Sequence, residues 1–212
     1  DTAPNIVLAI THGVLGQIFF AMLISLTVGL TRTWQDRRGV CDAPGADTDR
    51  KLTIAFIAVV VLQLILGALV RHFTWALAHF RYGLNVSPET LATRGQWALH
   101  THITIAVVVT LMAVGVGVRL WGIYPNTPAL RKTSKALLIL IGVQLLLGII
   151  AVVVVANDSP ENPPTAWDVL LTTCHQTVGA VILGLAVAAS LLVRRLLNAV
   201  PAPEPEPEAA PE

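Results

Sequence analysis

The feature that most constrains this chain is a series of five long apolar segments. A helix of about 20 residues crosses the roughly 30 Å of hydrocarbon in a bilayer. The five segments have lengths of this order and occupy residues 6–30, 52–70, 97–118, 136–156 and 167–193. Backbone groups in lipid must be hydrogen-bonded within the segment, so even the valine-rich runs are predicted to be helical. The predicted fold class is therefore all-α, a polytopic transmembrane bundle with five helices.

Composition supports the same class of protein. Charged residues make up 13% of the chain and hydrophobic residues 54%, whereas a soluble domain carries about 25% charged residues. The net charge is +1 and the basic residues are scattered among the connections. No nucleic-acid partner is expected from such a distribution, and a lipid bilayer is the expected surrounding.

The placement of Lys and Arg predicts the orientation. Of the 14 basic residues, 11 lie in three places: between the first and second segments, between the third and fourth, and after the fifth. The other 3 lie between the second and third segments. Cytoplasmic connections carry the excess of basic residues. We therefore expect the 32–51 loop, the connection after residue 118 and the C-terminus in the cytoplasm. The Pro- and Glu-rich stretch 197–212 is predicted to be disordered.

Histidines gather on the opposite side of the predicted membrane, near the segment ends. They are His12, His72, His79, His100, His102 and His175. Three of the segments share a histidine followed four residues later by a small residue: His102 with Ala106, His175 with Gly179, and His12 with Gly16. Residues i and i+4 lie on one face of a helix. Each imidazole would thus sit above an open patch, as a flat macrocycle requires.

An internal repeat relates the last four segments. The second carries Gln63 and Gly67, the fourth carries Gln144 and Gly148 at the same spacing, and each is followed by a histidine segment. Residues 52–196 are therefore predicted to form a pseudo-symmetric four-helix bundle built from two copies of a two-helix unit. Residues 1–31 match the second member of such a unit and are interpreted as the remnant of an N-terminal half. The two glutamines are expected to make interhelical amide hydrogen bonds at close helix contacts.

His102 and His175 come from equivalent helices and are predicted to meet at similar depth. Neutral imidazoles on opposite faces of one iron form a bis-histidine haem site, so both are predicted metal ligands. A zinc or copper site is the alternative and would take a third ligand from His100 or Cys174. Interfacial packing of the imidazoles is a further alternative.

The remaining candidates lie around this pair. His12 is a predicted ligand if further helices precede it, and an interfacial residue otherwise. His100 is on a different helix face from His102 and is expected to meet loop groups or a haem propionate. Arg71 and His72 would give a cationic rim for propionates, or snorkel at the interface. No carboxylate lies within the apolar core of a segment, and the nearest is Asp168 at the start of the fifth, so the catalytic residue is unknown.

Taken in order, residues 12–20, 63–72, 144–148 and 175–179, together with the His102 segment, resemble the haem A synthase family of cytochrome oxidase assembly proteins. That family has eight transmembrane helices in two similar halves and bis-histidine sites near the outer face. It oxidises a methyl group of haem O to the formyl group of haem A. The resemblance covers all five segments and would make them the fourth to the eighth helix.

The resemblance implies that His102 and His175 hold an electron-transferring haem b and that His12 is a ligand in the substrate half. Haem O would be the substrate and haem A the product. The implied partners are an electron donor such as a ferredoxin and a second copy or a haem O synthase, in a bacterial cytoplasmic membrane with the histidines toward the outer face. The family's second substrate-half ligand, its associated glutamate and its paired outer-loop cysteines have no match here.

Two other classes of protein compete with this interpretation. A di-haem electron-transfer protein resembling cytochrome b561 would have no substrate chemistry, and its haems would lie toward both faces. A structural or transport bundle would use its histidines only at the interface.

Overall fold

The structure is a computed structural model that describes residues 6–79, 88–157 and 165–199. Within these ranges the chain forms six helices and one short pair of strands. They are α1 (Ile6–Leu30), α2 (Arg32–Gln35), β1 (Cys41–Ala43), α3 (Ala46–His79), α4 (Pro88–Ile123), α5 (Pro128–Asn157), α6 (Ala166–Leu196) and β2 (Leu197–Ala199).

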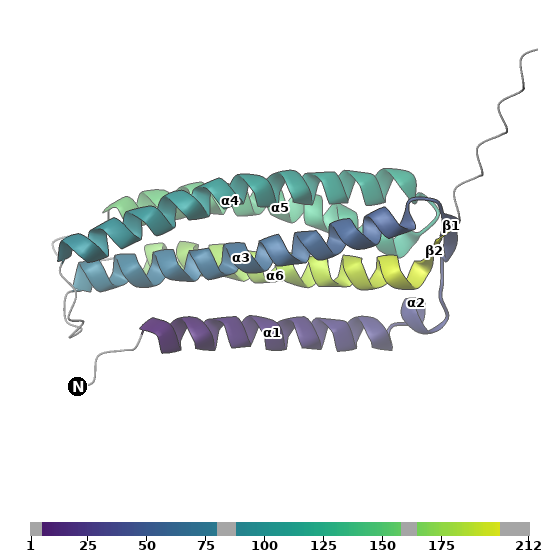
Figure 1. Ribbon diagram of the computed structural model, residues 1–212, viewed down its shortest axis with the longest axis horizontal. Helices are drawn as coiled ribbons and strands as arrows, with labels where there is room; N and C mark the ends of the chain where they lie inside the picture. The colour runs from purple at the N-terminus through teal and green to yellow at the C-terminus, as the bar shows by residue number, and fades with distance from the viewer. Residues whose placement is uncertain (1–5, 80–87, 158–164, 200–212) are drawn as a thin grey trace, which may run out of the picture.

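The prediction of an all-α fold with five membrane-length helices is confirmed. All helices except α2 are long and apolar enough to cross a membrane. They run alongside one another over most of their length (Figure 1). The fold is that of a multi-pass helical bundle.

Helices α3 to α6 form the predicted four-helix bundle. The closest pairs are α3 with α4 and α5 with α6, which are the two predicted repeat units, and the ring is closed by contacts of α4 with α5 and of α3 with α6. Helices α4 and α6 therefore lie diagonally across the bundle. The two histidine helices face each other across its axis.

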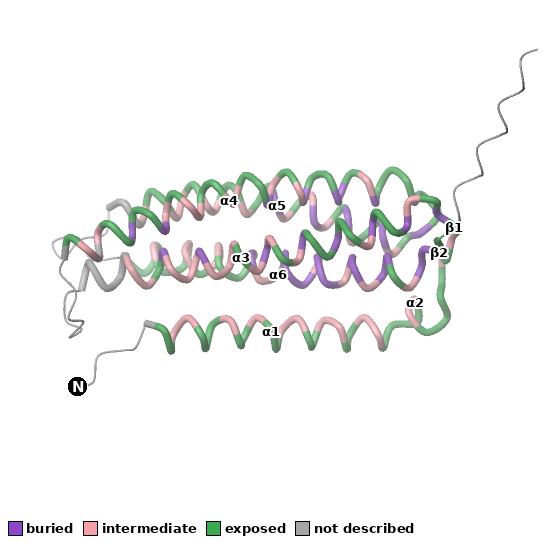
Figure 2. Tube along the Cα trace, in the orientation of Figure 1, coloured by how far each residue is buried: buried purple, intermediate pink, exposed green. Residues whose placement is uncertain are grey.

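The two halves of the bundle are packed differently. Buried residues concentrate toward the end that carries β1 and β2 (Figure 2). In α6 every buried residue lies at or after Gly179, and in the antiparallel α5 the last buried residue among those described is Ile141. Large side chains such as Phe56, Leu120 and Leu137 fill this end. The other half, which contains the histidines, holds fewer buried residues among those described.

Helix α1 lies beside the bundle, against α6 and α3. The backbone of Gly184 allows a close approach, because a Cβ there would lie 3.2 Å from Cε1 of Phe20. Large apolar side chains of α1, including Phe19 and Met22, are more than 60% exposed. Exposed apolar surface of this kind suits contact with lipid or with another helix.

The helices extend beyond the apolar segments, and this changes two predicted boundaries. The 32–51 loop contains α2, β1 and the start of α3. Asp47 and Asp49 lie in the first turn of α3, where negative charge favours helix formation. At the other end of the bundle, α6 begins at a capping box between Thr165 and Asp168.

The start of the predicted disordered tail is also different. Residues Leu197–Ala199 form β2, which pairs in parallel with β1 in the register Cys41↔Leu197. Asn198 Nδ2 donates to Asp42 Oδ1 at 3.0 Å, and Arg37 Nη2 donates to Asn198 Oδ1 at 2.8 Å. The first three residues of the predicted disordered stretch are thus held by strand pairing and by long-range hydrogen bonds of Asn198. Residues 200–212 lie outside the described part of the chain.

Candidate functional site

The predicted histidine pair is brought together inside the bundle. His102 of α4 and His175 of α6 are half-buried, and their ring centroids are 6.4 Å apart at an interplanar angle of 73°. Two imidazoles that bind one metal from opposite faces, each with a bond of about 2 Å, have centroids about 6 Å apart. The spacing therefore fits a shared metal centre between diagonal helices.

Each imidazole is hydrogen-bonded to a glutamine of the preceding helix. Gln63 Nε2 lies 3.3 Å from His102 Nε2, and Gln144 Nε2 lies 3.3 Å from His175 Nε2. Gln63 Nε2 also donates to the backbone oxygen of His102 at 3.1 Å. The predicted interhelical amide bonds are present, but the sequence analysis missed that their partners are the two imidazoles. The matching Gln-x-x-x-Gly pattern in the two repeats was the available signal.

The glycines of that pattern make room for the rings. A Cβ on Gly67 would lie 3.1 Å from Cε1 of His102, and one on Gly148 would lie 3.2 Å from Cε1 of His175. Gly179, which was expected to lie beneath a macrocycle, is buried against the Gln144 amide, with 3.3 Å between its ideal Cβ and Nε2. Ala106 is half-buried on α4, one turn beyond His102.

Four buried polar atoms around the pair have no hydrogen-bond partner among the described residues. They are Nδ1 of His102 and of His175, and Oε1 of Gln63 and of Gln144. Buried polar groups are nearly always hydrogen-bonded, and exceptions gather where a ligand, ion or water belongs. A metal-bound histidine uses one ring nitrogen for the metal and donates from the other, so each ring here still has a buried Nδ1 without a described acceptor.

The predicted cationic rim lies at the same end of the bundle. Arg71 Nη1 donates to Oε1 of Gln176, the residue after His175, and so joins α3 to α6. Arg71 is exposed and His72 half-buried, one turn beyond Gly67. The rim is therefore connected to the helix that carries the second imidazole.

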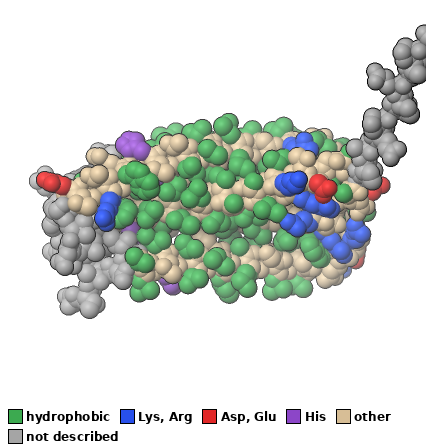
Figure 3. Space-filling model, in the orientation of Figure 1, with side chains coloured by type: hydrophobic (Ala, Val, Ile, Leu, Met, Phe, Trp, Pro, Cys, Tyr) green, Lys and Arg blue, Asp and Glu red, His purple; other side chains and the backbone are tan. Residues whose placement is uncertain are grey.

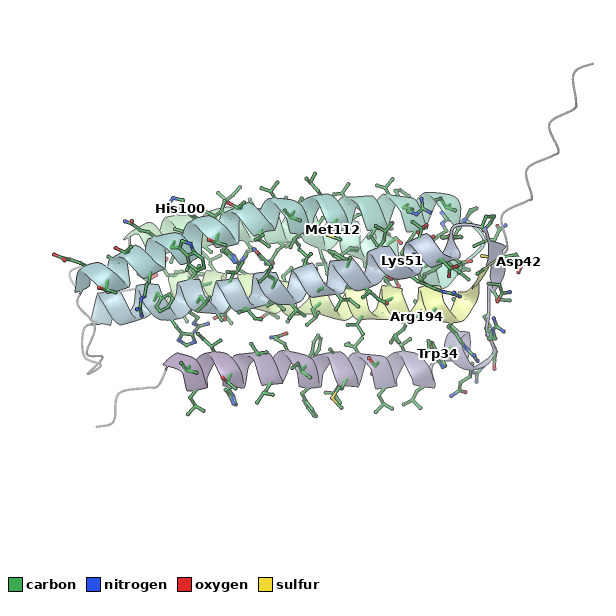
Figure 4. All side chains as sticks on the ribbon, viewed as in Figure 1. Trp34, Asp42, Lys51, His100, Met112 and Arg194 are labelled. Atoms are coloured by element: carbon green, nitrogen blue, oxygen red, sulfur yellow. The ribbon has the colours of Figure 1, made fainter. Side chains whose placement is uncertain are left out.

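His12 and His100 do not join the pair. His12 is exposed on α1, and a Cβ on Gly16 would meet nothing within 4 Å. His100 lies on the outer side of α4 (Figure 4), where its Nδ1 donates to the backbone oxygen of Gln96 in the same helix at 2.8 Å.

Within the described ranges, no three His, Cys, Asp or Glu side chains are placed to share a metal ion. The third ligand of the zinc or copper alternative is not in place there. Nothing can be said of the His79 side chain, which lies outside the described part.

A second polar cluster, not foreseen from the sequence, lies at the opposite end of the bundle. Asp49 of α3 is 1% exposed and accepts hydrogen bonds from Arg119 Nε and from the Tyr124 hydroxyl. Burial, and then the bond to Asp49, raises the pKa of Tyr124. The hydroxyl therefore remains a donor over the whole physiological pH range. This cluster joins α3 to the end of α4 and makes no contact with the histidine pair.

Comparison of the chain with family models, curated proteins and solved structures finds no match. The fold and the site define the class by themselves. The chain is an all-α bundle with five helices able to cross a membrane and a pair of imidazoles between diagonal helices.

Proposed function

We propose that this chain is a haem-binding membrane oxidoreductase in which His102 and His175 ligate one haem b from opposite faces. The observation that carries the proposal is the 6.4 Å spacing of the two rings. The unpaired buried Nδ1 and Oε1 atoms of the two His–Gln pairs support it, because they leave a donor and an acceptor for the hydrogen bonds that orient a metal-binding imidazole.

The surrounding residues fit the same group. The exposed guanidinium of Arg71 and the imidazole of His72 would meet the propionates. The apolar residues of α3 to α6 would surround the apolar part of the haem. A haem held in this way supplies one-electron transfer. The protein itself would contribute by holding the two imidazoles at the same depth and by limiting the access of water to the haem.

We further propose the reaction that the resemblance implies, oxidation of the haem O methyl group to the formyl group of haem A. Each of two hydroxylations would take one oxygen atom from dioxygen, two electrons and two protons, and the resulting diol would lose water to the aldehyde. Helices α3 to α6 would relay the electrons from a donor such as a ferredoxin. His12, with Gly16 beneath it on an open helix face, would be a substrate-half ligand.

The charge distribution supports the orientation that we propose. Lys and Arg gather at the end of the bundle near β1 and β2, and histidines lie toward the other end (Figure 3). By the positive-inside rule, the β1–β2 end would face the cytoplasm, and we propose that the membrane is a bacterial cytoplasmic membrane. A cytochrome b561-like protein would need imidazole pairs toward both faces. The described residues hold one pair, at one end.

A visible spectrum tests the haem proposal. The purified chain, expressed with haem supplied, should show a six-coordinate low-spin spectrum. His102→Ala or His175→Ala should abolish that spectrum, and His100→Ala, which changes an exposed ring outside the pair, should retain it. A colourless wild-type preparation, or six-coordinate haem in both ligand variants, would refute the pairing. Conversion of added haem O to haem A separates the synthase from a pure electron carrier.

A further inference from the structure

The two imidazoles are held in the same way in both repeat units, by an amide on the preceding helix. In each unit the amide nitrogen is 3.3 Å from the ring Nε2. In each unit the ring also rests against a glycine one turn from that glutamine. A contact that recurs in two copies of a unit has a common structural cause.

We propose that Gln63 and Gln144 are positioning residues that select the tautomer of His102 and His175. We also propose that each then accepts a hydrogen bond from the remaining ring N–H when Nε2 binds a metal. The second half of this proposal rests on the proposed haem function, and the first half does not.

The tautomer follows from which groups can donate. An amide NH₂ only donates, so the ring Nε2 beside it must present its lone pair, and a neutral imidazole then carries its proton on Nδ1. Gln63 is fixed in this sense because its Nε2 also donates to the backbone oxygen of His102, which only accepts. The Gln144 amide is held against the backbone of Gly179. The lone pair that the amides mark on each ring is the one that an iron would take.

The unpaired atoms point to the second role. In each unit the ring Nδ1 and the amide Oε1 are buried and without a described partner. The protonated Nδ1 of the histidine is a donor, and the Oε1 of the glutamine that contacts it is an acceptor. A histidine that binds a metal almost always donates its other N–H to an acceptor, which fixes its orientation and raises its basicity. If a metal took Nε2 in place of the amide, the glutamine side chain would be released, and its unpartnered Oε1 would be available to accept from Nδ1–H.

A purely structural role makes a different prediction. Polar side chains in membrane helices often join helices by hydrogen bonds, and removal of such a bond lowers stability without changing the tautomer. Substitution by Met retains the length of the glutamine side chain and removes its hydrogen bonds. Gln17→Met is the matched control, because Gln17 is a half-buried amide of α1 with no hydrogen bond to an imidazole among the described residues.

The first experiment uses the haem-free full chain with ¹⁵N-labelled histidine. The wild type should show His102 and His175 protonated at Nδ1. Gln63→Met should move His102 toward the Nε2–H form that is favoured in water and leave His175 unchanged, and Gln144→Met should do the converse. Gln17→Met should resemble the wild type. An unchanged tautomer in the Gln63→Met/Gln144→Met double variant would overturn the inference.

The second experiment uses the haem-loaded chain. Each Met variant should still bind haem, release it to an apo-globin about tenfold faster or more, and show a raised midpoint potential, because its ligand donates less charge to the iron. Gln63→Glu, with a stronger acceptor, should lower the potential. If the variants bind haem and their midpoint potentials equal that of the wild type, the acceptor role is refuted and the tautomer role is not. A colourless wild type would refute the proposed function, and the tautomer experiment would still decide the first half of the inference.

Discussion

At the scale of the residue, the site depends on small backbone positions opposite the rings. Gly67 and Gly148 each leave only enough space for the Cε1 edge of a histidine, at 3.1 and 3.2 Å from an ideal Cβ. Few real Cβ contacts are this short, so the ring must shift by a few tenths of an ångström when a methyl group is added. The glycines therefore set the positions of the two imidazoles.

This predicts that Gly67→Ala and Gly148→Ala weaken haem binding without unfolding the bundle. Alanine in a helix is favoured over glycine by about 1 kcal/mol, which offsets part of the cost of moving the ring. We expect haem affinity to fall about tenfold while the thermal midpoint of the haem-free protein changes little. Gly142→Ala is the control, since its Cβ would meet nothing within 4 Å. Equal haem affinity in all three variants would contradict the role of the two glycines.

A second residue-scale prediction concerns Asp49. Removal of one partner of a buried ion pair costs about 3–5 kcal/mol, and we expect about 2–3 kcal/mol for Asp49→Asn because the Arg119 side chain is 33% exposed. Asp47→Asn, in an exposed pair with Arg50, should change stability by less than about 1 kcal/mol. Unfolding in detergent measures both. The haem spectrum should be unaffected, because the cluster lies at the far end of the bundle.

The raised pKa of Tyr124 gives this cluster a pH dependence. A group whose pKa is higher in the folded state stabilises the fold fully below its unfolded pKa, about 10 for tyrosine, and loses this contribution as pH rises above that value. The wild type should therefore be more stable than Tyr124→Phe at pH 8, and the difference should shrink above about pH 10. A difference that grows with pH would contradict the assignment.

At the scale of the element, sequence patterns predicted what is local and repeated. Segment length predicted the five helices, and the shared Gln-x-x-x-Gly and His-x-x-x-small patterns predicted the pairing of α3 with α4 and of α5 with α6. The rotation of each helix about its axis could not be predicted. It decides that Gln63 meets His102 and that Gly179 meets an amide. The β1–β2 pairing was also out of reach, since it joins residues far apart in sequence.

The short β1–β2 pair predicts an effect of truncation. A chain that ends at Leu196 would lose the ladder, the Arg37–Asn198 bond and the Arg50 contact to Leu197 O. Trypsin should then cut after Arg37 and Arg38 at least several-fold faster, because local opening needs less free energy. A chain that ends at Ala199 keeps all these contacts and should be cut at the wild-type rate. Equal rates in the two truncations would show that the ladder does not protect this segment.

At the scale of the whole molecule, the bundle is polarised in packing and in charge. The end with β1 and β2 holds most of the buried residues and carries most Lys and Arg, while the histidine half holds fewer buried residues. The proposed haem would lie in the half with fewer buried residues, and its binding would displace the two glutamine amides from the ring Nε2 atoms. The packed half fixes the relative positions of α4 and α6, and so the spacing of the two rings.

The orientation of this polarity can be measured with an impermeant thiol reagent. Lys132→Cys changes an exposed residue near the start of α5, at the end expected in the cytoplasm, and Glu89→Cys changes an exposed residue in the first turn of α4, at the opposite end. Both are placed in a background in which Cys41 and Cys174 are replaced by serine and alanine. In spheroplasts the reagent should label position 89, and in inverted membrane vesicles it should label position 132. The reverse pattern would place the histidine pair near the cytoplasm, where an electron donor would reach the haem from the same side as the imidazoles.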